Sequence, residues 1–226
     1  MADNIYFGAI LTLICYFIGV TIHNKTKKAY FNPILIGIVL VVGVLMVFKI
    51  DYQVYNDSAK YISYLLTPAT VCLAIPLYKQ LEVLKHNFKA IVIGVCTGVI
   101  TSMTSVYLFS LAFSFNNAAY VTFLPKSITT AIAMGVIEEL GGYVSIGVAA
   151  IIVTGIIGNM VAIHILKLFK ITHPIAKGLA IGCSSHAIGT TKALEIGEIE
   201  GAMSSLAIVV SGLITVVLIS VFAGFI

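Results

Sequence analysis

Long apolar runs alternate with short polar connections along the whole chain. Six runs are close to or above membrane-crossing length: residues 5–22, 33–48, 62–77, 88–113, 144–168 and 202–226. They lack the two-residue alternation of barrel strands, so they predict helices of the roughly 20 residues that a bilayer requires. Only helices and closed barrels satisfy backbone polar groups in lipid. We therefore predict an all-α polytopic membrane protein, with about seven transmembrane helices once a more polar segment at 174–197 is included.

The composition agrees with a lipid environment and limits the classes of partner. Hydrophobic residues make up 60% of the chain and charged residues 10%, and the formal net charge is +4. The basic residues lie in short connections rather than on one soluble face, so the charge does not indicate nucleic-acid binding. The partner that the composition predicts is the lipid bilayer.

Lysines in alternate connections predict the orientation in the membrane. They occupy three connections: Lys25, Lys27 and Lys28; Lys79, Lys85 and Lys89; and Lys167, Lys170 and Lys177. An excess of lysine in short loops marks the cytoplasmic side. We therefore expect these connections and the C-terminus inside and the N-terminus outside.

This orientation requires that residues 119–143 do not cross the membrane, since a crossing would move the third lysine-rich connection outside. The segment contains Pro125, Lys126, hydroxyl residues and the pair Glu138 and Glu139. We predict a re-entrant segment that dips into the membrane and returns. Irregular backbone at that depth needs surrounding protein or a watery cavity.

The re-entrant segment divides one domain into two oppositely directed triplets of elements. Within residues 1–226, an extra N-terminal span (1–32) precedes a first repeat (33–115), the re-entrant segment (119–143) and a second repeat (145–226). Each repeat has a broken central segment, at 59–84 and 174–197. Inverted repeats with interrupted segments at matching positions are typical of secondary transporters, whose substrate site lies near the bilayer midplane.

Polar side chains gather at three places in these segments. Such groups are costly inside a membrane, so their clustering indicates a function. The predicted substrate site comprises Thr67, Thr70, Lys126, Ser127, Thr129, Thr130, Ser184, Ser185, His186, Thr190, Thr191 and Lys192. The predicted helix breaks are Pro68, Pro76, Pro125, Gly182 and Gly189. A half-helix is expected to start near Thr190, and the unpaired N–H groups of such a start suit a carboxylate.

Two of the candidate residues have two interpretations each. Lys126 is either a snorkelling anchor or the countercharge of an anion. His186 is either satisfied by neighbouring hydroxyl groups or couples a proton, a role also open to Glu195. The prolines of the first broken segment either expose half-helix ends or only kink a span.

The remaining polar residues have more ordinary expectations. Lys192 and Glu195 lie three residues apart on one helical face and can neutralise each other. Glu198 and Glu200 are expected on a solvated outer rim. Asn159 is expected to make a helix-packing hydrogen bond beside two glycines.

The sequence carries no catalytic or metal-binding pattern. Ser184, Ser185 and His186 are consecutive, whereas a nucleophile and its base must face each other with an orienting acid. The four cysteines lack metal-ligand spacing and are expected to be small buried residues. We therefore expect no enzyme activity, no cofactor and no metal.

Three ordered motifs resemble the LrgB/CidB family, in a style closer to CidB. They are PATVCLAIPLY (68–78), LPKSITT (124–130) and SHAIGTTKALE (185–195), and the resemblance covers essentially the whole chain. It implies a multi-pass protein of the bacterial inner membrane that acts beside a small holin-like partner of the LrgA/CidA type. It further implies control of murein hydrolases, autolysis and programmed cell death, and an association with pyruvate or glycolate transport.

Two hypotheses of different classes follow. The first is a secondary transporter of a small monocarboxylate such as pyruvate, lactate or glycolate, with hydroxyl groups around the carboxylate and Lys126 or Lys192 as the positive charge. The second is an antiholin-type regulatory subunit without a substrate, which binds its partner through lipid-facing small residues such as Gly155 and Gly158. In both cases the small size of the chain favours a homo-oligomer.

Overall fold

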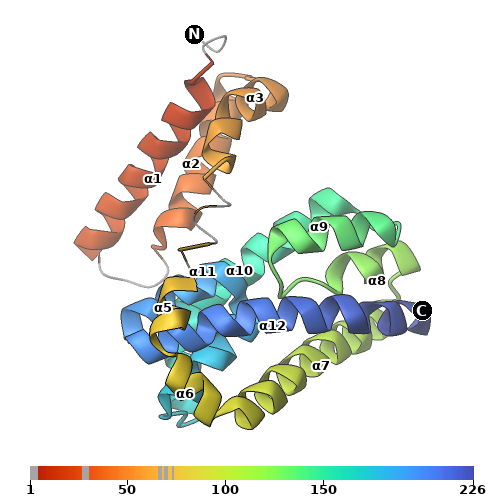
Figure 1. Cartoon of the computed structure of the whole chain (residues 1–226). Coiled ribbons are helices and arrows are strands. Elements are labelled where there is room, and N and C mark those ends of the chain that lie inside the picture. The colour runs from red at the N-terminus through yellow and green to blue at the C-terminus, as the bar shows by residue number, and fades with distance from the viewer. Residues whose placement is uncertain (1–4, 27–30, 66–67, 69–70, 73) are drawn as a thin grey trace. The chain divides into compact units, whose positions relative to one another are not determined.

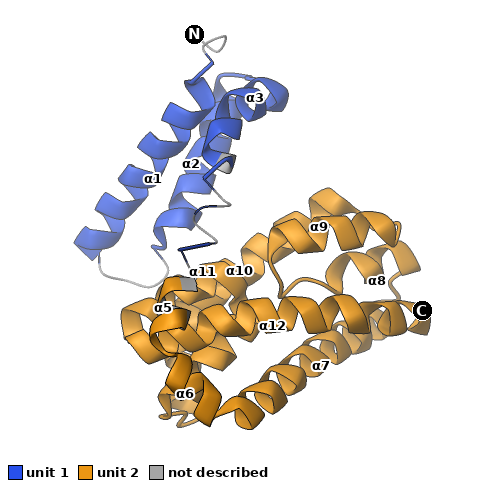
Figure 2. Ribbon diagram, in the orientation of Figure 1, with its two compact units in different colours: residues 1–72 blue, residues 73–226 orange. Residues whose placement is uncertain are grey.

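The chain folds entirely into helices in the part that the structure describes. A computed structural model describes residues 5–26, 31–65, 68, 71–72 and 74–226. It divides the chain into two compact units, Met1–Cys72 and Leu73–Ile226 (Figure 2). The predicted all-α class is confirmed, and each unit is described by itself.

Among its described residues, unit 1 has three complete helices: α1 (Phe7–Thr26), α2 (Pro33–Val47) and α3 (Tyr52–Ser63). The start of α2 is well defined, because Asn32 Oδ1 accepts the N–H of Ile34 at 2.8 Å and Pro33 needs no partner for its nitrogen. A buried hydrogen bond of 2.8 Å from the N–H of Gly8 to Ser58 Oγ joins α1 to α3. Unit 1 is therefore a short three-helix bundle.

Unit 2 contains the remaining elements (Figure 1): α5 (Ala74–Lys79), α6 (Leu81–His86), α7 (Phe88–Ala112), α8 (Asn117–Phe123), α9 (Thr130–Glu139), α10 (Val144–Leu168), α11 (Pro174–Ile196), α12 (Glu198–Phe222) and a 3₁₀ turn, η1 (Ala223–Phe225). Its main core joins α7, α8, α11 and α12. Val95, Tyr120 and Met203 are completely buried there. The outer faces of the long helices remain apolar and exposed, as expected for lipid contact.

Four helices among the described residues are long and apolar enough to cross a membrane. They are Phe7–Thr26, Phe88–Ala112, Val144–Leu168 and Glu198–Phe225. The apolar helix α2 has only 15 residues, and part of the run at 62–77 lies outside the described residues. The multi-pass character is confirmed, whereas the count of about seven spans is not, because the second hairpin described below removes one of them.

The segment predicted to be re-entrant forms a helical hairpin, here called the first hairpin (Asn117–Glu139). Its helices α8 and α9 have 7 and 10 residues, far below the roughly 20 needed for a span. The connection after α9 packs on α8, because the N–H of Tyr143 donates to Thr122 Oγ1 at 2.8 Å. The hydroxyl group of Tyr120 donates to the carbonyl of Phe222 at 2.9 Å and fastens the hairpin to α12. This arrangement agrees with a segment that enters and returns.

Helix α11 reverses direction at His186, where the backbone has φ 40° and ψ −142°. Ile181 and Ala193 pack in one core cluster on the two sides of the reversal, and Lys177 and Ile196 line one cavity. In a straight helix, Lys177 and Ile196 would be about 28 Å apart. We call Pro174–Ile196 the second hairpin. The prediction that 174–197 crosses the membrane is therefore wrong.

The predicted breaks at Gly182 and Gly189 are also wrong, whereas the half-helix expected to start near Thr190 starts three residues earlier, directly after His186. Both glycines are helical, and the second helix of the hairpin resumes directly after His186. The glycines serve close packing instead. A Cβ atom on Gly182 would meet the carbonyl of Ser204 and Cβ of Ala207, so α11 and α12 touch where a larger residue cannot fit.

Contacts across unit 2 fix the direction of its long helices. Gly94 and Gly98 of α7 approach Leu179 and Cys183, and Gly178 and Gly182 approach the first residues of α12. Helices α7, the first half of α11 and α12 therefore run in parallel, and α7 and α12 both run toward the end marked C in Figure 1. The predicted opposite directions of 88–115 and 201–226 are wrong, because the reversal at His186 removes one crossing.

This correction also moves the C-terminal end of the chain. Asn87 and His173 line one cavity, so the two lysine-rich connections of unit 2 lie at the same end, as predicted. Ile226 lies at the other end, where its carbonyl accepts a 2.6 Å hydrogen bond from Asn117 Nδ2. The expectation that the C-terminus shares a side with these lysines is therefore wrong.

Candidate functional site

The tips of the two hairpins lie together at half the length of the long helices of unit 2. Lys126 of the first tip and Ser184 of the second line the same two cavities, with volumes of about 780 and 370 Å³. The smaller cavity also reaches Thr154 and Gly158, near the middle of α10. The larger reaches Ser102, near the middle of α7. If these helices span the membrane, the tips lie close to its midplane.

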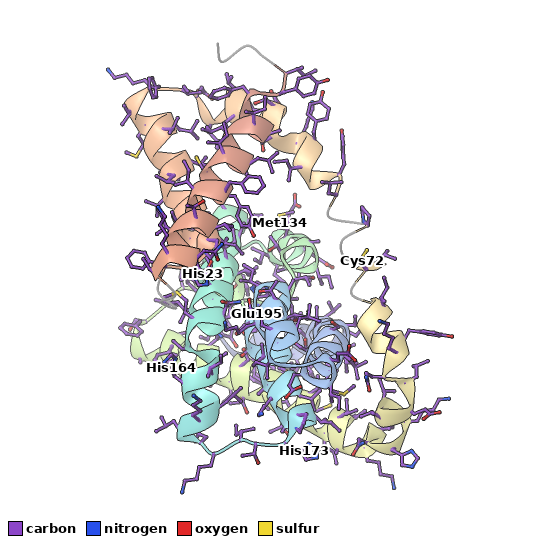
Figure 3. All side chains as sticks on the ribbon, turned by 90° about the vertical axis from the view of Figure 1, so that its left-hand side faces the viewer. His23, Cys72, Met134, His164, His173 and Glu195 are labelled. Carbon is purple, nitrogen blue, oxygen red and sulfur yellow. The ribbon has the colours of Figure 1, made fainter. Side chains whose placement is uncertain are left out.

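The larger cavity extends from one end of the unit to the tips. It begins beside Asn87 and His173. His173, labelled in Figure 3, lies on the connection between α10 and α11 at this end of the unit. The cavity ends at Lys126 and Ser127. No aspartate or glutamate lines either cavity among the described residues, so the lysine charge faces an uncompensated space.

A chain of hydrogen bonds starts at this lysine. Lys126 Nζ donates to Ser127 Oγ at 3.2 Å. Ser127 Oγ and Ser102 Oγ form a hydrogen bond of 3.1 Å, in which either oxygen can donate. Ser127 is 6% exposed, and both serines line the larger cavity. Lys126 and Ser127 of the first tip and Ser102 of α7 thus offer one cation and two hydroxyl groups, a set that suits an anion.

The second tip presents two adjacent serines. Ser184 Oγ donates to the carbonyl of Ala180 at 2.7 Å and lies 3.0 Å from Ser185 Oγ. A Cβ atom on Gly158 would meet the side chain of Ser185. Gly158 therefore makes room for the tip rather than forming a lipid-facing surface, and the expected partner contact through this glycine is wrong.

His186 turns away from both cavities. Its Nε2 lies 2.9 Å from the carbonyl of Ile151, and a Cβ atom on Gly155 would meet its ring. The side chain is 3% exposed. A ring nitrogen that faces a carbonyl carries its proton there, so the histidine is satisfied by backbone rather than by neighbouring hydroxyl groups. Gly155 is likewise an internal packing residue and not a partner surface.

Thr190 and Thr191 hold the second hairpin in place. Thr190 Oγ1 donates to the carbonyl of His186 at 3.0 Å and lies 2.7 Å from Ser204 Oγ of α12. Asn159 of α10 donates to Thr191 Oγ1 at 3.0 Å and to the carbonyl of Ile188 at 2.9 Å. The expected packing role of Asn159 is therefore present, and both threonines contact protein rather than the cavities.

The charged residues after the tip pair with each other. Lys192 Nζ lies 2.6 Å from Glu195 Oε2, as expected, and neither residue lines the two cavities. Glu198 is exposed. Glu200 is 7% exposed and lies 3.7 Å from Lys177 Nζ, so its expected place on a solvated outer rim is wrong. The close contact of α12 with the start of the second hairpin buries this carboxylate.

The other predicted residues lie farther from the cavities or outside the description. Thr129 precedes α9 as its N-cap and Thr130 is its first residue, but neither lines the two cavities. Pro125 lies in the tip of the first hairpin, where the break was expected. Pro76 lies in the first turn of α5. Thr67 and Thr70 lie outside the described residues.

Sequence reasoning missed the contribution of α7. Its hydroxyl residues Thr97, Thr101, Ser102 and Ser105 line the larger cavity. Residues 97, 101 and 105 recur every four positions and therefore share one helical face. This spacing was the available signal, but the apolar character of the whole run concealed it. Among the described residues, no group of three or more His, Cys, Asp or Glu side chains is placed to hold a metal ion.

The fold and the tips define a multi-pass helical membrane protein with two helical hairpins inside one helical unit. Comparison with known sequences gives the family. The chain belongs to the LrgB-like family, whose profile matches residues 12–225.

Its relatives match over almost their whole length. The antiholin-like protein LrgB of Bacillus mycoides (strain KBAB4) is 39% identical over 222 residues, which cover 98% of this chain and 96% of the relative. The proteins of the same name from Bacillus cereus (strain B4264) and Bacillus anthracis (strain CDC 684 / NRRL 3495) have the same identity and coverage. No solved structure matches the chain.

Proposed function

We propose that this protein is a secondary transporter of a small monocarboxylate, such as pyruvate, lactate or glycolate, across the bacterial inner membrane. The observation that carries the proposal is the meeting of two oppositely entering hairpin tips, with Lys126 between two cavities. Interrupted helices that meet at mid-depth are the usual construction of transporter sites.

The chemistry of the tips favours an anion with few atoms. Lys126 supplies the charge, and the hydroxyl groups of Ser127 and Ser184 lie beside it. Helix α9 starts at Thr130, shortly after the lysine, so its unpaired N–H groups add partial positive charge near the tip. A monocarboxylate needs one such countercharge, whereas a dicarboxylate would leave a second charge unpaired in a space without another lysine.

The larger cavity supports access from one side, and Lys126, Ala180 and Ser184 lie between it and the smaller cavity. The smaller cavity extends along α10 from Val153 to Leu166, toward the same end. The larger cavity reaches the lysine-rich end, which we expect inside. In this proposal a small movement of one tip against the other closes the larger cavity and opens the far side.

The structure supports a narrower role for His186 than the proton coupling expected from sequence. Its ring is bonded to α10 and faces neither cavity. We propose that it positions Ser185, its neighbour in the tip.

A second function is favoured by the names of the relatives. These are antiholin-like proteins, and they match 98% of this chain. We therefore also propose that the protein takes part in the regulation of murein hydrolases and autolysis, together with a small holin-like membrane partner. Transport and regulation are compatible if lysis responds to carboxylate metabolism.

The test is uptake of labelled pyruvate, lactate and glycolate into proteoliposomes that contain this chain alone. Lys126→Gln and Ser185→Ala should reduce uptake of the transported acid. The matched controls are Lys192→Gln, whose partner is Glu195, and Ser205→Ala, whose hydroxyl group bonds to its own helix at Gly201. Equal uptake by all five proteins and by empty vesicles would contradict transport.

A further inference from the structure

A third cavity of unit 2, distinct from the two at the hairpin tips, has the features of a lipid-headgroup site. It lies where α10 ends, has a volume of about 480 Å³ and is separate from the hairpin tips. Its lining combines two kinds of residue: the aliphatic Ile163, Leu166, Ile171 and Ile196, and the lysines Lys167, Lys170 and Lys177 together with Thr172. The proposed transport assigns no role to the three lysines of this cavity.

The charge at this cavity is unbalanced. No acidic residue lines it among the described residues, and the nearest counterpart is Glu200, 3.7 Å from Lys177 Nζ. Lys167 and Lys170 have no ion pair within the described part of the chain. The ammonium groups of Lys167 and Lys170 are therefore uncompensated, whereas that of Lys177 is paired with Glu200.

The backbone holds Lys170 at the cavity in a conformation that glycine usually adopts. Two residues after the end of α10, Lys170 has φ 54°. The N–H of Ile171 closes the turn by donating to the carbonyl of Leu166 at 2.8 Å. A non-glycine residue in this left-handed position carries a conformational cost. A lysine placed there keeps a charge at the rim that glycine would lack.

The surroundings place this charge at the boundary between lipid and water. Leu168 and Phe169, between the two lysines, are 75% and 70% exposed. Exposed apolar side chains at the end of a candidate span insert into lipid, while neighbouring lysines reach the headgroups. Basic pockets between membrane helices at this level suit anionic lipids.

We propose that this cavity binds the headgroup of an anionic phospholipid. Lys167 and Lys170 hold the phosphodiester, and the aliphatic lining receives the first part of an acyl chain. A free phosphate would use the lysines but not the aliphatic residues, so the lining favours the lipid.

The test is titration of the full chain, purified in uncharged detergent, with phosphatidylglycerol or phosphatidylcholine in mixed micelles, followed by thermal unfolding. Phosphatidylglycerol should raise the melting temperature more than phosphatidylcholine. The double variant Lys167→Gln with Lys170→Gln should bind phosphatidylglycerol roughly 30-fold more weakly, from about one kcal/mol per lysine. Lys177 is left intact, because its loss would leave Glu200 buried without a partner.

A double variant of equal charge separates the site from general attraction. Lys85 and Lys89 lie at the same end of unit 2 but not at this cavity, so Lys85→Gln with Lys89→Gln should bind like the wild type. Equal weakening in both double variants overturns the proposal. So does the same stabilisation by inorganic phosphate at equal concentration, which would make the cavity a site for a soluble anion.

Discussion

The two hairpins of unit 2 reach the same depth through different sequence devices. The first is interrupted by Pro125 and carries the lysine of the site at its tip. The second reverses at a buried histidine, and its glycines pack against α12 and against its own first helix. A proline break can therefore be predicted from the sequence, whereas a reversal that depends on packing cannot.

The comparison predicts unequal roles for the two tips in transport. Lys126→Gln removes the charge that would neutralise the substrate, and the loss of such a partner costs about 2–5 kcal/mol, well over tenfold in affinity. Ser184→Ala removes one neutral hydrogen bond, worth about 1 kcal/mol. Concentration dependence of uptake measures both. Equal effects would mean that the tips contribute alike.

Gly182 tests whether the second hairpin is held by packing or bends at its glycines. Gly182→Ala should destabilise the protein by about 1–3 kcal/mol, because its Cβ would meet the backbone of Ser204. Gly135→Ala of the first hairpin is the control, since nothing lies within 4 Å of its Cβ position. Thermal unfolding of the purified protein compares them. An unchanged or raised melting temperature for Gly182→Ala would favour a flexible hinge.

Tyr120 tests the attachment of the first hairpin. Tyr120→Phe removes the hydrogen bond to the carbonyl of Phe222 and should cost about 1 kcal/mol in unfolding free energy. Tyr107→Phe is the matched control, because the structure gives this tyrosine ring contacts but no hydroxyl bond. Denaturant unfolding in detergent gives both values. A larger loss for Tyr107→Phe would contradict the assignment.

His186 should show the smallest effect of the series. At φ 40° glycine is favoured over alanine, so His186→Gly should be more stable than His186→Ala by about 1 kcal/mol. Both variants lose the same bond to Ile151, so their difference isolates the backbone. Thermal unfolding of the two variants gives the order of their melting temperatures and so tests this expectation. If alanine is the more stable, the reversal does not require this conformation.

The sequence predicted the class, the first hairpin and Lys126 for physical reasons that act locally. Proline removes a backbone donor, and a lysine inside an apolar chain is conspicuous. It misplaced the second hairpin because Gly182 and Gly189 were taken as breaks. Their close approach to Ser204 and Ile181 is a tertiary property that no local pattern carries. The hydroxyl residues of α7 were missed because the apolar character of the run concealed their four-residue spacing.

The central claim is that the second hairpin enters and leaves at one membrane face, so the most direct measurement is labelling of single cysteines by an impermeant maleimide. In a chain without its own cysteines, Thr172→Cys and Glu198→Cys should react from the same side, because these exposed positions flank the hairpin. Glu139→Cys, at the end of the first hairpin, should react from the other side. Reaction of positions 172 and 198 from opposite sides would show a crossing helix and contradict the account.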